Sequence, residues 1–153
     1  MSESSRLPRT SAREAPENLP ILLREPLRAM NEELIARLAE GGHPEVRLPH
    51  GNVLQYLDDD GTRVSVLAER AHLTKQAMAQ LVAHLERHGY VERIPDPTDG
   101  RAKLVRATAR GRDVYAIARA FVADVDARLE RELGAAKMRR LRALLEDLNA
   151  VWR

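Results

Sequence analysis

The side chains best suited to specific recognition chemistry lie on one face of a helix predicted from Lys75 to His88. With an advance of about 100° per residue, two amides, two alanines and one cation fall together on that face: Gln76, Ala79, Gln80, Ala83 and Arg87. A glutamine can pair with adenine through two hydrogen bonds, and an alanine methyl group can contact the methyl group of thymine. The face is therefore suited to reading base edges, and the alternative is an ordinary solvated helix with small side chains.

The start and the opposite face of this helix have different predicted roles. Thr74 is predicted to be its N-cap, and Thr74 and Lys75 stand where contacts to phosphate are favoured over contacts to bases. Gly89 is predicted to end the helix in a left-handed conformation. The opposite face is apolar and is predicted to pack against a core through Ala77, Met78, Leu81, Val82 and Leu85.

A basic hairpin is predicted directly after the helix. Residues 90–94 and 103–107 have the composition of strands, and the Pro- and Asp-rich residues 95–100 predict the turn between them. Arg101, near the tip, is suited to a minor groove, whose negative potential attracts a guanidinium group, and Asp99 is placed to brace or pair with it. The alternative is an exposed turn whose charges only aid solubility.

Cationic residues continue through the returning strand. The formal net charge of +2 is too small to indicate a polyanionic partner, so the local distribution of charge carries the argument. Arg101 and Lys103 are expected to face DNA, and at most one or two of the three arginines that follow are expected to reach phosphates. The stretch has five cations and no acid, namely Arg101, Lys103, Arg106, Arg110 and Arg112.

Composition excludes most other classes of function. The 153 residues contain no cysteine, which excludes disulfides, thiolate metal sites and cysteine-based redox sensing. The sequence has neither a nucleophile elbow nor a glycine-rich phosphate loop, so no enzyme, no catalytic residues and no cofactor are expected. His84 and His88 are spaced to share a helix face, but no third ligand is evident nearby, so no metal is expected.

The N-terminal part of the chain is predicted to hold an arm and a helix. Residues 1–18 are polar and aperiodic, which predicts a flexible arm without the apolar core of a signal peptide. Apolar residues then recur every three or four positions, which predicts a helix that begins near Pro26 or is kinked there, and that ends at Gly41-Gly42. No apolar run is long enough to span a membrane, so a cytoplasmic protein without membrane contact is expected.

The remaining elements are helices on either side of the basic hairpin. Short helices are predicted for residues 50–57 and 64–71, the second with Ser65 as its N-cap. After Thr108 two long amphipathic helices are predicted, with a break at Gly134. Long amphipathic helices without a compact core of their own usually bury the apolar face against a partner, and a second copy of the chain is the obvious candidate.

Residues 67–112 resemble the core of the MarR (multiple antibiotic resistance regulator) winged-helix family. Their sequence is LAERAHLTKQAMAQLVAHLERHGYVERIPDPTDGRAKLVRATARGR. The matching motifs are LAER, the Thr-Lys that opens the predicted reading helix, and the runs LVAHLERHGYVER and DPTDGRAKLVRATARG. The resemblance implies a mainly α fold with a small β-wing. In that fold, residues 46–108 form a winged helix-turn-helix DNA-binding lobe, and residues 19–45 and 109–153 form the N- and C-terminal dimerisation helices.

The resemblance also implies a function. Family members bind palindromic double-stranded DNA operators as homodimers, which here would place Thr74 to Gln80 in a major groove and Asp99 and Arg101 in the adjacent minor groove. A repressor is favoured over an activator on this resemblance alone. The alternative from another class is a winged-helix module that contacts proteins without reading DNA, and such a module would more often expose an apolar patch on this surface.

Two residues depart from the family pattern. His72 occupies a turn position where glycine is common, so its backbone is expected to be strained in the left-handed region. Gly100 replaces a frequent second arginine, which leaves Arg101 as the one arginine at the tip of the wing.

Members of the family often release DNA when a small aromatic or anionic effector enters a cleft between the dimerisation helices and the DNA-binding lobe. The alternative for this chain is that its tyrosines pack in the core and that Arg24 is solvated. The expected partners are therefore double-stranded DNA, a second copy of the chain and such an effector. By position, the residues expected to line the cleft are Arg24, His50, Tyr56 and Tyr115.

Overall fold

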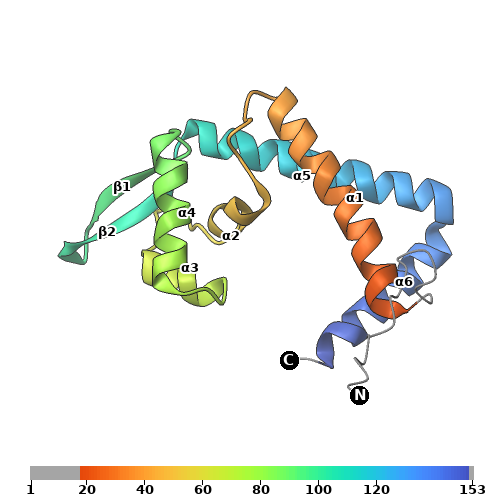
Figure 1. Cartoon of the computed structure of the whole chain (residues 1–153). Helices are drawn as coiled ribbons and strands as arrows, with labels where there is room; N and C mark the ends of the chain where they lie inside the picture. The colour runs from red at the N-terminus through yellow and green to blue at the C-terminus, as the bar shows by residue number, and fades with distance from the viewer. Residues whose placement is uncertain (1–17, 152–153) are drawn as a thin grey trace, which may run out of the picture.

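Helices make up most of the molecule, and a two-stranded β-ribbon projects from one end (Figure 1). The computed structural model describes residues 18–151, so the predicted arm lies outside the described residues except for Asn18. Near the ribbon lie α3 and α4; from there α5 leads to the other end, where α1 crosses it and α6 turns back. The predicted mainly α class with a small β-wing is confirmed. The elements are α1 (Leu19–Glu40), η1 (Leu48–His50), α2 (Gly51–Leu54), α3 (Val64–Arg70), α4 (Lys75–Arg87), β1 (Val91–Asp96), β2 (Asp99–Ala107), α5 (Ala109–Leu133) and α6 (Ala135–Ala150).

The first helix begins before its internal proline. The Asn18 side chain accepts a hydrogen bond from a backbone N–H of the first turn at 3.1 Å, and α1 begins at Leu19. Pro26 lies inside the helix, so the predicted alternative of a start near Pro26 is wrong. The helix ends before Gly41-Gly42, as predicted.

The two short helices of the lobe differ from their predicted bounds. In place of a helix at residues 50–57, a 3-10 turn and a single α turn run from Leu48 to Leu54, because Pro49 favours the first turn of a helix. Ser65 was predicted to be the N-cap of the next helix, and this is wrong. The N-cap position is Arg63, and no side chain caps that end of α3.

Three helices end in the same hydrogen-bonded turn. The residue after each C-cap is left-handed, with φ of 93° at Gly42, 52° at His72 and 74° at Gly89. At the end of α3 the Leu73 N–H donates to the Ala68 carbonyl at 2.8 Å and the His72 N–H donates to the Glu69 carbonyl at 3.1 Å, and these two bonds define a Schellman motif. The predicted left-handed conformations of Gly89 and His72 are confirmed, and His72 alone carries a Cβ atom there.

The core lies between the short helices and the base of the ribbon. The predicted apolar face of α4 is confirmed, because Met78, Val82 and Leu85 are fully buried and Ala77 and Leu81 are partly buried. No helix within residues 18–151 is long and apolar enough to cross a membrane. The largest fully buried side chains are Tyr90, Leu67, Met78, Leu85, Val53, Val82, Val91 and Val105.

The ribbon is longer and its turn tighter than predicted. β1 pairs with β2 in antiparallel register, and the turn consists of residues 97–98 in place of the predicted 95–100. The register shifts beside the turn, because Asp96 lies opposite Asp99 whereas Pro95 lies opposite Lys103. Residues 100–102 therefore form an irregular bulge on β2.

Helix α5 approaches the start of β1 through a glycine. A Cβ atom on Gly111 would lie 2.1 Å from the backbone carbonyl oxygen of Tyr90, so no side chain fits there without movement of the backbone. The Thr108 hydroxyl caps α5 by accepting the Gly111 N–H at 3.2 Å, and it donates to the Gly89 carbonyl at 2.6 Å. This contact sets the direction in which α5 leaves the lobe.

His72→Gly is expected to raise the free energy of unfolding by about 0.5–1 kcal/mol, because glycine avoids the penalty of the left-handed region but loses more backbone entropy on folding. Chemical denaturation at neutral pH measures the change. His72→Ala is the matched control, since it removes the same imidazole and keeps a Cβ atom, and it should bring no such gain. Equal gains from both substitutions would mean that the side chain, and not the backbone, is strained.

Candidate nucleic-acid interface

The predicted reading face of α4 is exposed to solvent. The Thr74 hydroxyl accepts the Ala77 N–H at 3.1 Å, so the predicted N-cap is confirmed. Ala79 is half-buried, which leaves its methyl group less available than its predicted role requires. The exposed side chains present donors and acceptors along the length of the helix, and they are Lys75, Gln76, Gln80, Ala83 and Arg87.

A buried carboxylate anchors the ribbon to the start of α3. Asp96 is 5% exposed and accepts hydrogen bonds from the Thr98 N–H at 2.8 Å, the Thr98 hydroxyl at 2.7 Å and the Arg63 Nε at 2.7 Å. These bonds, first those from Thr98 and then that from Arg63, lower the pKa of Asp96 to about 2. We refer to Arg63, Asp96 and Asp99 as the wing clamp, because Arg63 also lies 3.7 Å from the Asp99 carboxylate.

Asp99, which was predicted to brace or pair with Arg101, contacts the backbone of Arg101 and not its side chain. Asp99 Oδ1 accepts the Arg101 N–H at 3.1 Å, while the other carboxylate oxygen faces Arg63. The Arg101 side chain is exposed in the bulge of residues 100–102, and Lys103 is exposed on the strand that follows. The wing clamp thus holds the two residues that flank the turn of the ribbon, Asp96 and Asp99, and leaves the guanidinium group of Arg101 facing solvent.

The remaining cations of the basic stretch have partners inside the molecule. Arg106 pairs with Glu92 on the facing strand at 2.7 Å, and the Arg112 guanidinium donates to the Ala107 carbonyl at 2.9 Å. Arg110 is likewise engaged, at the junction described next. The stretch that is free of acids in sequence is therefore not free of acids in space, since Glu92 faces Arg106 and Glu45 faces Arg110.

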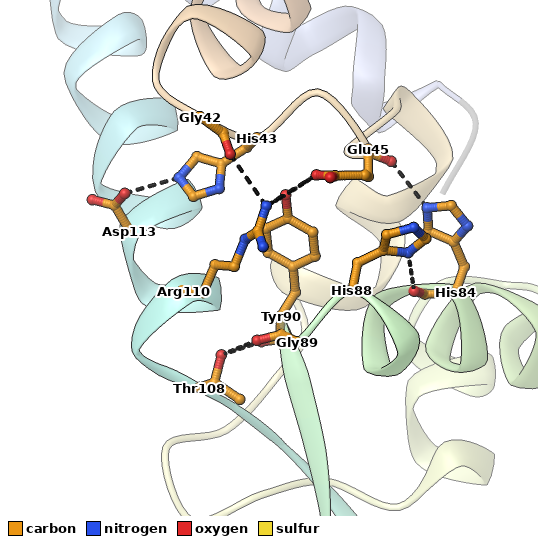
Figure 2. Close-up of polar contacts among 10 residues, drawn as sticks. All are labelled: Gly42, His43, Glu45, His84, His88, Gly89, Tyr90, Thr108, Arg110 and Asp113. Carbon is orange, nitrogen blue, oxygen red and sulfur yellow. Dashed lines mark hydrogen bonds and ion pairs between the residues drawn. The ribbon is translucent and has the colours of Figure 1, made fainter.

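A buried tyrosine joins three elements beside this surface (Figure 2). The hydroxyl of the fully buried Tyr90 donates to Glu45 Oε2 at 2.7 Å. The Arg110 guanidinium donates to the same carboxylate at 3.1 Å and to the Gly42 carbonyl at 3.2 Å, and it lies 4.6 Å from the centre of the Tyr90 ring. Burial raises the pKa of Tyr90, and the hydrogen bond from Tyr90 lowers the pKa of Glu45. Glu45, Tyr90 and Arg110 are called the Tyr90 junction below.

Histidines surround this junction. His43 is 4% exposed, and its Nε2 lies 2.8 Å from the Asp113 carboxylate at the start of α5. On the other side of Tyr90, His84 and His88 of α4 lie near Glu45 (Figure 2). The spacing of His84 and His88 in the sequence suggested a shared helix face, and in the structure their rings lie against each other with centroids 4.4 Å apart.

The structure does not bring the four predicted effector-binding residues together. Arg24 is exposed and pairs with its neighbour Glu25 at 3.0 Å, and His50 is buried against His84. Tyr56 is partly buried against the core, whereas Tyr115 is 52% exposed. In one copy of the chain these four side chains are therefore divided between the surface, where Arg24 and Tyr115 lie, and the interior of the lobe, where His50 and Tyr56 lie.

A cavity does lie between α1, α2 and α5. Its volume is about 210 Å³, and of the four predicted residues it is lined by Tyr115. Sequence reasoning missed Arg47 and Gln55, which supply its charged and amide groups, because nothing in their local sequence indicates that they face α5. The apolar part of the wall comes from Leu34, Ile35, Leu38, Val46, Leu48, Leu54, Val114 and Ala118.

The arrangement of α3, α4 and the ribbon defines a class of protein. Two helices joined by a tight turn at His72 are followed by an antiparallel ribbon, and Thr62 pairs with Val105 on the free side of β2. A helix-turn-helix followed by such a ribbon is a winged helix-turn-helix.

Within that class, part of the chain is similar to the MarR family. Residues 46–102 match the model of the family, so the resemblance inferred from the sequence is confirmed. The MarR family is a family of transcription regulators and not of enzymes, in agreement with the prediction of a protein without catalytic function.

Similarity to a characterised relative covers the middle of the chain. Over 90 residues it is 36% identical to the HTH-type transcriptional repressor Rv2887 of Mycobacterium tuberculosis, an alignment that covers 59% of this chain and 65% of that protein. The chain therefore matches slightly less than two thirds of the length of this relative.

Solved structures share the fold over most of the chain. The MarR family transcription regulator SP03579 superposes with a TM-score of 0.72 at 17% identity, covering 87% of both chains. MepR of S. aureus, in a structure with DNA, superposes with a TM-score of 0.70 at 21% identity, covering 88% of this chain and 98% of that one. At these identities the likeness concerns the fold.

Asp96→Asn is expected to lower the free energy of unfolding more than Asp99→Asn does, because Asp96 is buried and Asp99 is half exposed. The difference between wild type and Asp96→Asn should also depend on pH. Because the pKa of Asp96 falls from 3.8 to about 2 on folding, the carboxylate stabilises the fold fully above about pH 4 and loses that effect as the pH falls towards 2. Denaturation curves between neutral pH and about pH 2 measure it, and a difference that stays constant throughout contradicts the assignment.

Proposed function

We propose that this protein is a transcriptional repressor that binds a palindromic double-stranded DNA operator as a homodimer. The observation that carries the proposal is that α4 and the ribbon lie at the same end of the molecule (Figure 1). The amides on the solvent side of α4 and Arg101 near the turn of the ribbon are exposed. A helix in a major groove and a basic element in the neighbouring minor groove is an established docking geometry. MepR of S. aureus, whose fold this chain shares, is known in a complex with DNA, which supports DNA as the partner.

Base reading is assigned to the exposed amides of α4. Gln76 and Gln80 stand one helical turn apart on the solvent face, and each can pair with adenine through two hydrogen bonds. Thr74 and Lys75 at the start of the helix, and Arg87 near its end, are suited to phosphate contacts on either side of the groove. Ala79, being half-buried, contributes by allowing close approach more than by contact.

The wing contributes a second contact of a different kind. Arg101 is exposed at the tip, where the wing clamp holds the backbone through Asp99, and Lys103 is exposed just behind it. A guanidinium group inserted into a narrow minor groove gains from the concentrated negative potential there. Arg101 therefore adds affinity that depends on groove width and on salt concentration.

Dimerisation is assigned to residues 19–45 and 109–153, with residues 46–108 as the DNA-binding lobe. Helices α1 and α6 leave leucines exposed that would be covered in a dimer. In α1 these are Leu19, Leu22, Leu23 and Leu27, and in α6 they are Leu141 and Leu144, with exposed fractions between 38% and 56%. A twofold axis through these helices would present two copies of α4 to successive major grooves.

The alternative of a protein-interaction module is less well supported. Such a module would expose apolar side chains on the surface of α4 and the wing. Within the described residues, none of the large exposed apolar side chains lies between positions 64 and 107. That surface instead presents amides and cations.

A small aromatic or anionic effector is proposed to occupy the cavity between α1, α2 and α5. The largely apolar wall suits an aromatic body, and Arg47 supplies a cation for an acidic group. Because the cavity is bounded both by proposed dimerisation helices and by the lobe, an occupant would alter the spacing between the two copies of α4.

Arg101→Ala is expected to weaken operator binding by more than about tenfold at fixed salt, and to reduce the slope of log affinity against log salt by about one, because a phosphate-facing charge is lost. The measurement is anisotropy titration of a labelled duplex that the protein itself selects from a random-sequence library. Arg119→Ala is the matched control, because it also removes one exposed positive charge, here from α5. It should change neither the affinity nor its dependence on salt. Sedimentation should show the same oligomer for all three proteins, and unchanged affinity of Arg101→Ala contradicts the role of the wing.

Gln76→Ala and Gln80→Ala are expected to change which duplexes are selected, with a loss of discrimination of about 1–3 kcal/mol at one base pair of each half-site. Binding to unrelated DNA should change little, because neither side chain carries a charge. Selection and sequencing with each variant measures the preference. Uniform weakening across all sequences would assign these residues to positioning the helix.

A further inference from the structure

Four of the five histidines of the chain lie around the point where the connection after α1 meets α4, three of them ring against ring and the fourth beside Tyr90. They come from three separate segments: His43 from the connection, His50 from η1, and His84 and His88 from α4. The fifth, His72, lies in the turn between α3 and α4 and is exposed. Nothing in the proposed DNA or effector contacts uses these four side chains.

Three of the rings form a stack. The centroids of His50 and His84 are 4.3 Å apart with ring planes 17° from parallel, and those of His84 and His88 are 4.4 Å apart at 36°. We call these three residues the histidine stack. Two imidazolium rings at this separation repel each other, so the stack favours neutral rings.

The hydrogen bonds of the stack fit neutral rings as well. Nδ1 of His50 accepts the Arg47 N–H at 2.9 Å, so a second proton on His50 would abolish that bond by placing two donors face to face. The other two rings donate to carbonyls: His84 Nε2 to Glu45 at 3.0 Å, and His88 Nδ1 to His84 at 2.9 Å. A proton added to His50 therefore costs a buried hydrogen bond as well as creating a buried charge.

Among residues 18–151, no unpaired carboxylate lies beside the stack to balance a charge on it. The ionisable groups that face it from the packed segments are Glu45, Arg47, Tyr90 and Arg110. The carboxylate of Glu45 already binds Tyr90 and Arg110, and Arg47 adds positive charge. Burial, then His84, Arg47 and His88, lower the pKa of His50 to about 4.

The stack connects the proposed dimerisation part of the chain to the proposed reading helix. His50 lies in η1, which follows α1 through the connection that holds Glu45, whereas His84 and His88 lie on α4. We propose that the histidine stack is an acid-sensitive contact, and that acidification lowers DNA affinity by separating η1 from α4. This inference rests on the proposed function, since it concerns the regulation of the same interface.

Proton linkage determines whether a falling pH opens or closes the histidine stack. When the stack opens and the His50 ring is solvated, that ring takes up a proton near the ordinary histidine pKa of about 6.5. Because the closed stack keeps His50 neutral down to about pH 4, the open state binds more protons between these two values, and a falling pH favours opening. Simple electrostatics predicts the opposite outcome, since protonated histidines on a DNA-binding protein would strengthen binding.

The experiment measures affinity for the self-selected duplex at about pH 7.5 and about pH 5.5 at constant salt. Wild type is expected to lose several-fold and at most about tenfold, which is the limit for a single proton linked over this range. The test variant is His50→Asn combined with His84→Gln. An asparagine oxygen can accept the Arg47 N–H, a glutamine nitrogen can donate to Glu45, and neither side chain titrates. This variant should lose about twofold or less over the same range.

His72→Asn is the matched control, because it removes the histidine outside the cluster, and asparagine tolerates the left-handed backbone there. It should keep the full acid-dependent loss. Wild-type affinity that is equal or higher at the acidic pH overturns the proposal, as does an equal loss in wild type and the double variant. If the double variant fails to fold, His50→Asn alone serves, because it removes the ring that takes up the proton, and an undiminished loss in that variant also overturns the proposal.

A measurement without DNA separates this inference from the proposed function. The free energy of unfolding of wild type and His72→Asn should fall between about pH 7.5 and about pH 5.5, and that of the double variant should fall less. If no duplex is selected at neutral pH, the proposed function fails while this comparison still tests the stack. If a duplex is selected and the three proteins show the same pH dependence of unfolding, the stack proposal fails alone.

Discussion

The structure depends on the contact between the backbone carbonyl of Tyr90 and the start of α5. The Schellman turn that ends α4 delivers Tyr90 to this point, and the missing side chain of Gly111 lets α5 pass close to it. The same carbonyl accepts the Thr108 N–H at 3.1 Å, while the hydroxyl of the tyrosine reaches Glu45 after α1. Tyr90 therefore joins the reading helix, the ribbon, α5 and the connection after α1, and fixes their positions relative to one another.

The ribbon is held by a second, separate anchor. The wing clamp connects it to the start of α3 through a carboxylate that is buried and fully hydrogen-bonded. The wing clamp fixes the ribbon near its turn, and the Tyr90 junction fixes it where β1 begins. Arg101 therefore has a defined position relative to α4. Positioning of this kind reduces the entropy lost when an exposed side chain binds in a groove.

The sequence predicts those parts of the molecule whose causes are local. Helical periodicity predicts both faces of α4, and the Thr74 cap and the Gly89 turn follow from single residues. The wing clamp could not be predicted, because Arg63 and Asp96 are 33 positions apart and no local pattern links them. The pairing of Arg106 with Glu92 depends on the register of the ribbon.

The local sequence is a weaker guide to the predicted effector-binding residues, for a related reason. Tyr56 and Tyr115 have similar local sequence surroundings of polar and apolar residues, yet one packs against the core and the other faces solvent. Whether a side chain lines a cavity depends on how α1 and α5 cross, and that angle is set by contacts far apart in the chain. Sequence patterns therefore identify elements and their faces more reliably than the shared space between elements.

The outer edge of the ribbon has a consequence for the behaviour of the protein in concentrated solution. β2 is covered on both sides, by β1 and by the bridge to Thr62, but β1 has an open edge. Such an edge invites strand pairing between molecules and can seed aggregation. Pro95 has no N–H to offer, and the exposed charges of Glu92 and Arg93 stand on the same short strand. The strand that supports the wing is thereby protected against forming intermolecular sheets.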